Sequence, residues 1–248
     1  MRPAALFAAF ALIAGPAFAT DGTPSVVFQR ATPDATVSLK LPDTVRQEPR
    51  LWSRLVRGDE AVLTRFLQRS RGDAASYAAE GRPDVRDEED IAYELAGRTG
   101  RLVGLIREGS SYSGGAHPNP FIQAVLWDRR EQRIVDFSAL FRKDADYARL
   151  DAALCEAVTS AKAARQGALP IGGPIWKCPT WRKSQAVLAP GTVPGKAGGL
   201  IFLFGPYEIG PYSEGEWRVA VPLGAFRSAL SPAYAQEFAG GLLTKEVD

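Results

Sequence analysis

The spacing of apolar residues changes along this chain, and that change restricts the fold more than any other feature. Residues 36–41 alternate apolar and polar side chains, as half-buried strands do. Between residues 51 and 67 the apolar residues recur at spacings of three and four, which predicts an amphipathic helix with a break at Gly58. Alternation typical of strands returns in residues 91–137. The chain therefore mixes helices and strands in separate runs.

The second half of the chain repeats this order. Residues 144–166 predict a second amphipathic helix, and its buried stripe is Tyr147, Leu150, Leu154, Val158 and Ala161. Residues 199–204 form a continuous apolar run, typical of a strand buried on both faces, and residues 217–223 alternate. We expect residues 70–90 to be a helix end followed by a loop, and residues 109–120 and 167–199 to be loops or mostly irregular. These patterns predict an α+β fold, an antiparallel sheet with two main amphipathic helices, divisible into two small fused modules.

The first residues have the features of a secretory signal peptide. Residues 1–19 carry a positive charge at Arg2, an apolar run over residues 4–13 and a small-residue ending at Ala19. The run is shorter than the roughly 20 residues that a membrane helix needs, although an uncleaved anchor is the alternative. Cleavage before Thr20 would leave 248 − 19 = 229 residues. We therefore expect a periplasmic or secreted protein with no membrane span after cleavage.

The expected export would place the two cysteines in an oxidising compartment. Cys155 and Cys178 both follow the predicted cleavage site. An even number of cysteines in an oxidising compartment favours a disulfide, with two buried thiols as the alternative. The bond would attach the second helix to the loop that follows it.

Composition excludes several classes of function. The chain has one His and two Cys, too few for the multi-ligand sites that transition metals require. Its 30 Lys and Arg residues nearly balance 28 Asp and Glu, so the overall charge does not favour nucleic acid as a partner. We expect no metal and no cofactor.

Two segments rich in Gly and Pro are the most distinctive motifs. Glycine permits positive φ angles and proline stiffens the chain, so both segments should be shaped loops that present polar and aromatic side chains. The first, residues 111–120, reads SYSGGAHPNP, and the second, residues 204–215, reads FGPYEIGPYSEG. The side chains that they offer as candidate binding residues are Tyr112, His117, Asn119, Tyr207, Glu208 and Tyr212.

These motifs carry a resemblance to known families. The pattern Tyr-x-Gly-Gly-Ala-His-Pro-Asn, the Phe-x-x-Leu-Phe segment at residues 137–141, and the later run Phe-x-Pro-Tyr-Glu-Ile-Gly-Pro-Tyr are similar to domain-of-unknown-function families 4163 and 3298. These families include the extracytoplasmic domain of the RsiV anti-sigma factor and the non-catalytic region of the peptidoglycan deacetylase PdaC. The resemblance places a 4163-type module at residues 25–108 and a 3298-type module at residues 110–230.

The resemblance implies recognition without catalysis. In RsiV this domain binds lysozyme, and in PdaC the reaction belongs to a separate domain with metal-binding His residues. A chain with one His lacks that deacetylase domain. The implied function is an exported, non-enzymatic recognition module whose ligand is a protein such as lysozyme, or peptidoglycan.

The residues themselves leave two alternatives. A cell-wall glycan hydrolase would need two carboxylates about 5–10 Å apart, for which Glu208 with Glu214 or Asp136 are the candidates. A purely structural envelope protein is the other. His117 has no nucleophile or orienting carboxylate beside it in the sequence, so we expect no catalytic residues.

Overall fold

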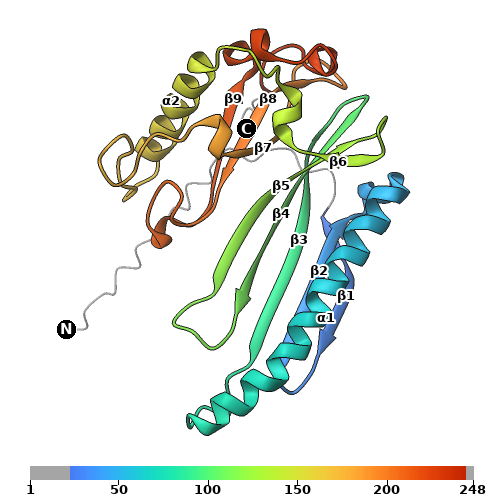
Figure 1. Ribbon diagram of the computed structural model, residues 1–248, viewed down its shortest axis with the longest axis vertical. Coiled ribbons are helices and arrows are strands. Elements are labelled where there is room, and N and C mark those ends of the chain that lie inside the picture. Colours follow the sequence, from blue (N-terminus) through green and yellow to red (C-terminus); the bar gives the residue numbers. More distant parts are fainter. Residues whose placement is uncertain (1–22, 244–248) are drawn as a thin grey trace, which may run out of the picture.

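Two sheets packed face to face, each with a helix on its outer side, make up residues 23–243, the part of the chain that the computed structural model describes (Figure 1). The predicted signal peptide and its cleavage site at Ala19 and Thr20 lie outside these residues. The elements in chain order are β1 (Pro24–Ala31), β2 (Ala35–Pro42), α1 (Pro49–Ala79), β3 (Asp87–Arg98), β4 (Leu102–Tyr112), β5 (Asn119–Asp128), β6 (Arg133–Val135), α2 (Ala148–Ala164), β7 (Gln185–Pro190), β8 (Ala197–Phe204) and β9 (Trp217–Pro222).

The first six strands form one sheet in sequence order. Neighbouring strands are antiparallel except β2 and β3, which run parallel because α1 carries the chain back between them. The second sheet contains β7, β8 and β9, all antiparallel. The α+β class predicted from the apolar spacing is confirmed.

Helix α1 covers one face of the six-stranded sheet. It runs through Gly58 without a break, which corrects the expectation from the sequence. An exposed glycine lowers helix stability by only about 1 kcal/mol. Burial of the apolar residues that precede and follow Gly58 in the helix outweighs this cost. The helix ends at Ala79, within residues 70–90, where a helix end followed by a loop was expected. Its buried side chains pack on β2, β3 and β4; they are Leu51, Leu55, Leu63, Phe66 and Leu67.

A buried carboxylate fixes α1 to the sheet. Asp59 accepts hydrogen bonds from the Tyr93 hydroxyl at 2.6 Å and from the Arg107 Nη2 at 2.9 Å. Burial and the nearby Asp59 charge raise the pKa of Tyr93, so its hydroxyl keeps its proton and donates to Asp59. These bonds set both the rotation and the position of α1 along the sheet.

The second sheet packs on part of the opposite face of the first, against β3, β4 and β5. Between the sheets lies an apolar layer made of Ala96, Ile106, Ile122, Val187, Ala189, Ile201 and Leu203. Strand β7 supplies two of these residues, although residues 167–199 were expected to be irregular. Its six residues, QAVLAP, are too few to show a clear period between the surrounding Gly and Pro residues.

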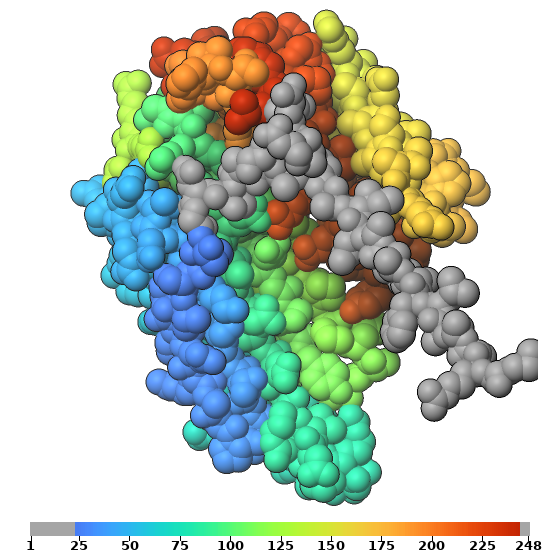
Figure 2. Space-filling model, turned by 180° about the vertical axis from the view of Figure 1, so that it is seen from behind, coloured from blue at the N-terminus to red at the C-terminus, as the bar shows by residue number. Residues whose placement is uncertain are grey.

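Helix α2 covers the outer face of the three-stranded sheet. The predicted stripe is confirmed, with Tyr147, Leu150, Leu154 and Val158 buried and Ala161 packed beside them. The predicted disulfide is also present, joining Cys155 and Cys178 with their Cα atoms 5.1 Å apart. Seen from behind, α2 (yellow) and the β1 and α1 region (blue) lie on opposite sides of the molecule (Figure 2).

The predicted loop at residues 109–120 is shorter than expected. Strand β4 continues to Tyr112 and β5 already begins at Asn119, leaving a turn of six residues between them. The predicted module boundary at residues 108–110 falls inside β4. The six-stranded sheet thus contains strands from both predicted modules.

We predict that Asp59→Ala lowers the free energy of unfolding by about 3 kcal/mol, because it leaves the Arg107 guanidinium without its buried partner. Urea denaturation of the purified protein measures this loss. Glu60→Ala, one residue along the same helix, is the control and should change stability by less than about 0.5 kcal/mol. Equal losses in the two variants would contradict the assigned role of Asp59.

Candidate functional site

The two Gly- and Pro-rich motifs meet in the folded protein. The rings of His117 and Tyr212 stack with centroids 4.0 Å apart. The Tyr212 hydroxyl also donates a hydrogen bond at 2.8 Å to the carbonyl of Pro118, which lies 94 residues earlier in the sequence. The Tyr207 ring lies 5.9 Å from that of Tyr212. We call His117, Tyr207 and Tyr212 the aromatic patch.

The turn that carries His117 is held by the end of α1. Gly114 has a φ of +68°, and a Cβ atom there would come within 2.8 Å of the Tyr77 ring. Arg82 donates a hydrogen bond to the Gly114 carbonyl. The Tyr77 hydroxyl donates to Asp87 at 2.9 Å, which positions the ring. Position 114 thus requires glycine for both its backbone conformation and the close ring contact.

The loop that carries Tyr207 and Tyr212 is held by α2 through a buried ion pair. Lys162 is 2% exposed, pairs with the Glu214 carboxylate and donates to the Ile209 carbonyl at 2.8 Å. Glu214 also accepts the Leu169 backbone N–H at 2.7 Å. A Cβ atom at Gly210 would lie 2.3 Å from that carboxylate, so only glycine fits there.

Tyr207 is exposed and conformationally strained. Its side chain is 61% exposed, more than any other Phe, Trp or Tyr among the described residues, and its φ is +69°. A bulky residue in the left-handed region costs on the order of 1–3 kcal/mol, and such strain clusters at functional sites. The buried ion pair between Lys162 and Glu214 holds the loop that contains this strained residue.

The other three predicted residues lie outside the aromatic patch. Glu208 is exposed in the same loop as Tyr207, and partial burial of its carboxylate raises its pKa. Tyr112 ends β4, paired with Glu88 of β3. Asn119 starts β5 on the sheet face opposite to that of Tyr112, because strand residues alternate and the two are seven apart across a turn. Of the six candidate residues, ring contacts thus join His117 to Tyr212 and Tyr212 to Tyr207.

A charged cluster lies between the two sheets. Arg218 of β9 pairs with Glu94 of β3 at 2.6 Å and with Glu108 of β4. Glu216 faces the same space, and burial together with the Glu108 charge raises its pKa to about 7. No sequence pattern marks this cluster, since a charged residue in an alternating strand usually faces water.

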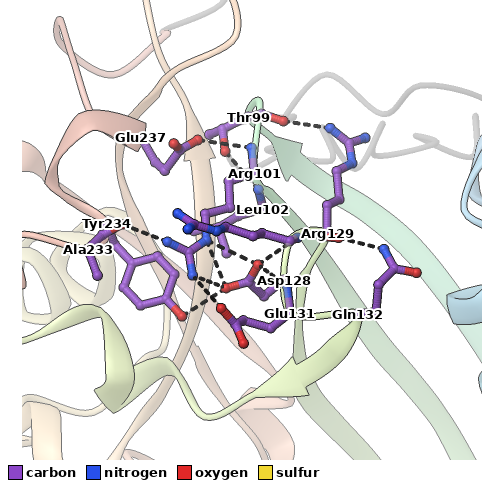
Figure 3. Close-up of polar contacts among 11 residues, drawn as sticks. Thr99, Arg101, Leu102, Asp128, Arg129, Glu131, Gln132, Ala233, Tyr234 and Glu237 are labelled. Carbon is purple, nitrogen blue, oxygen red and sulfur yellow. Dashed lines mark hydrogen bonds and ion pairs between the residues drawn. The ribbon is translucent and has the colours of Figure 1, made fainter.

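A second polar network ties the end of the described chain to the six-stranded sheet (Figure 3). Buried Asp128 accepts hydrogen bonds from Arg101 Nε at 2.9 Å and from the Tyr234 hydroxyl at 2.9 Å. Burial alone would raise the pKa of Asp128, but the Arg101 hydrogen bonds hold it below its usual value. Glu237 accepts the Arg101 backbone N–H at 3.1 Å. Because these groups satisfy one another, the network is structural.

Within residues 23–243 there is no group of three or more His, Cys, Asp or Glu side chains placed to hold a metal ion. No helix within the same residues is long and apolar enough to cross a bilayer.

Part of the chain is similar to a protein family of unknown function. Residues 138–224 match the family model described as "Protein of unknown function (DUF3298)". This part of the chain is therefore similar to DUF3298 domains. The matched residues contain α2 and the whole three-stranded sheet, and they fall inside the predicted 3298-type module at 110–230.

Solved structures of this family share the fold. A DUF3298 family protein from Pseudomonas aeruginosa is 17% identical, with a TM-score of 0.54, over 90% of this chain and 98% of that one. A member from Bacteroides fragilis is 14% identical, with a TM-score of 0.58, over 90% and 97% of the two chains. No curated protein matches this sequence.

We predict that Lys162→Met lowers the free energy of unfolding by about 3 kcal/mol, because it leaves the Glu214 carboxylate buried without a cation. Thermal and urea denaturation measure the loss. The matched control is Lys183→Met, at an exposed lysine. Adding Glu214→Gln should recover part of the loss; an additive double variant would show that the two groups are not coupled.

We predict that Glu216→Gln stabilises the protein at about pH 8 and has little effect near pH 4. The raised pKa means that the folded state retains a proton that the unfolded chain releases, so the Glu216 contribution to stability falls as pH rises from 4.5 to about 7. The gain should be about 1 kcal/mol after allowance for partial exposure.

Melting temperatures across this pH range measure the effect. Glu88→Gln, at an exposed position on β3, is the control and should give the pH profile of the unaltered protein. A Glu216→Gln profile parallel to that of the unaltered protein would contradict the assignment.

Proposed function

We propose that this protein is an exported, non-enzymatic recognition module of the cell envelope and that the aromatic patch is its ligand-binding surface. Tyr207 carries the proposal, because the fold maintains a strained backbone that holds a large aromatic ring 61% exposed. Exposed Tyr rings combine apolar area with a polar hydroxyl, which suits both sugar rings and protein surfaces. The ligand that we propose is a protein such as lysozyme, or peptidoglycan.

The contacts of the candidate carboxylates favour recognition over glycan hydrolysis. Glu214 is held by Lys162 and by the Leu169 N–H, which keeps it in its buried ion pair. Asp136 accepts the Ser138 backbone N–H at 2.8 Å and caps the short helical turn that follows. Glu214 and Asp136, the two candidates for the second catalytic carboxylate beside Glu208, are therefore both held in other contacts. Soluble muropeptides released by the protein, and lost in Glu208→Gln, would instead establish the hydrolase.

We predict that Tyr207→Gly weakens ligand binding about 30-fold, a typical loss for an aromatic hot spot, without destabilising the protein. Glycine accepts a φ of +69° freely, so the variant should be as stable as the unaltered protein or more so. Pull-down with immobilised lysozyme and sedimentation with purified peptidoglycan measure binding, and melting temperature measures stability.

The control variant is Val26→Ala, at another exposed apolar residue, which is 54% exposed and lies on β1. It should bind as the unaltered protein does. Retention on neither ligand, or equal retention of the Tyr207→Gly variant, would contradict the proposal.

A further inference from the structure

The outward face of α1 carries a row of arginines. With 3.6 residues per turn, five arginines fall within an arc of about 120° opposite the buried stripe. All five are exposed; they are Arg50, Arg54, Arg57, Arg65 and Arg71. We call them the arginine row. From Arg50 to Arg71 it extends about 32 Å along the helix.

The arginine row lacks internal counter-charges. Within residues 23–243, none of its five side chains makes a hydrogen bond or an ion pair. The acidic residues of the same helix lie elsewhere: Asp59 faces the sheet and binds Arg107, and Glu60 and Asp73 lie outside the arc. The row is therefore a concentrated positive surface on a chain whose formal net charge is only +2.

The row is also sterically free. Helix α1 lies on the outside of the molecule, and no other described element covers its outward side (Figure 1). Its apolar residues are used for packing on the sheet, so the face that remains offers charge without an apolar surface for insertion.

From this geometry we propose that the arginine row docks the protein onto the anionic headgroup surface of a phospholipid bilayer. A straight row on one helix meets phosphates best where they lie in a plane, and guanidinium groups bind phosphate in a bidentate manner. The arc includes no aromatic side chain on which nucleic acid bases would stack. None of the five arginines belongs to the aromatic patch, so the two surfaces can be altered by different substitutions.

The test is co-sedimentation of the full chain with vesicles of phosphatidylglycerol and phosphatidylcholine. Vesicles of phosphatidylcholine alone measure any contribution from the apolar residues 4–13, which no variant alters. Binding to the anionic vesicles should be strong at low salt and lost near 1 M salt, where the screening length is about 3 Å.

The decisive variant replaces Arg54, Arg57 and Arg65 with Gln. Each basic residue at an anionic surface contributes about a fivefold gain, so binding should weaken about 100-fold. The matched control replaces Arg130, Arg149 and Arg227, three exposed arginines elsewhere, and should bind as the unaltered protein does. Circular dichroism checks that both variants keep their helix content.

Three results would overturn the proposal. The first is no binding to anionic vesicles at low salt, and the second is equal weakening by the two triple variants. The third is binding to duplex DNA that exceeds vesicle binding and depends on the same arginines, which would identify a different polyanion as the partner.

Discussion

The apolar contact between the two sheets is the interaction on which the rest of the structure depends. Val187 and Ile201 from the smaller sheet pack on Ile106 and Ile122 of the larger one, which buries part of the second face of the six-stranded sheet. With α1 on the first face, the larger sheet is covered from both sides where β3, β4 and β5 meet the smaller sheet. Burial of this kind is the main favourable term in folding, and here it also sets the distance between the loops that the two sheets carry.

The aromatic patch follows from that arrangement. His117 lies on a turn of the larger sheet and Tyr212 on a loop of the smaller one, so their rings can stack only when the sheets are docked. Each loop is also attached to its own helix, the turn through Tyr77 of α1 and the loop through Lys162 of α2. Both helices therefore contribute to the geometry of the patch without lying in it.

Sequence patterns predicted the elements whose burial has a clear period. The stripe of α2 and the fully buried β8 agree with expectation because each presents apolar residues at a spacing that only one element type satisfies. Strand β7 was not predicted, because its six residues lie between Gly and Pro residues and are too few to show a clear period. The break expected at Gly58 was wrong because a local preference of about 1 kcal/mol yields to packing along the whole helix.

The candidate site was predictable in its residues but not in its contacts. Glycine and proline marked both loops, because backbone shape there is dictated by residue type, and the pairing of Cys155 with Cys178 followed from their number. By itself, then, the sequence determined the α+β class, the distinctive loops and the disulfide. Tertiary structure alone decided that Lys162 is buried against Glu214 and that Arg218 meets Glu94 and Glu108 between the sheets. The physical reason is that a charged side chain is equally compatible with water or with an opposite charge, and only the docking of distant elements supplies that charge.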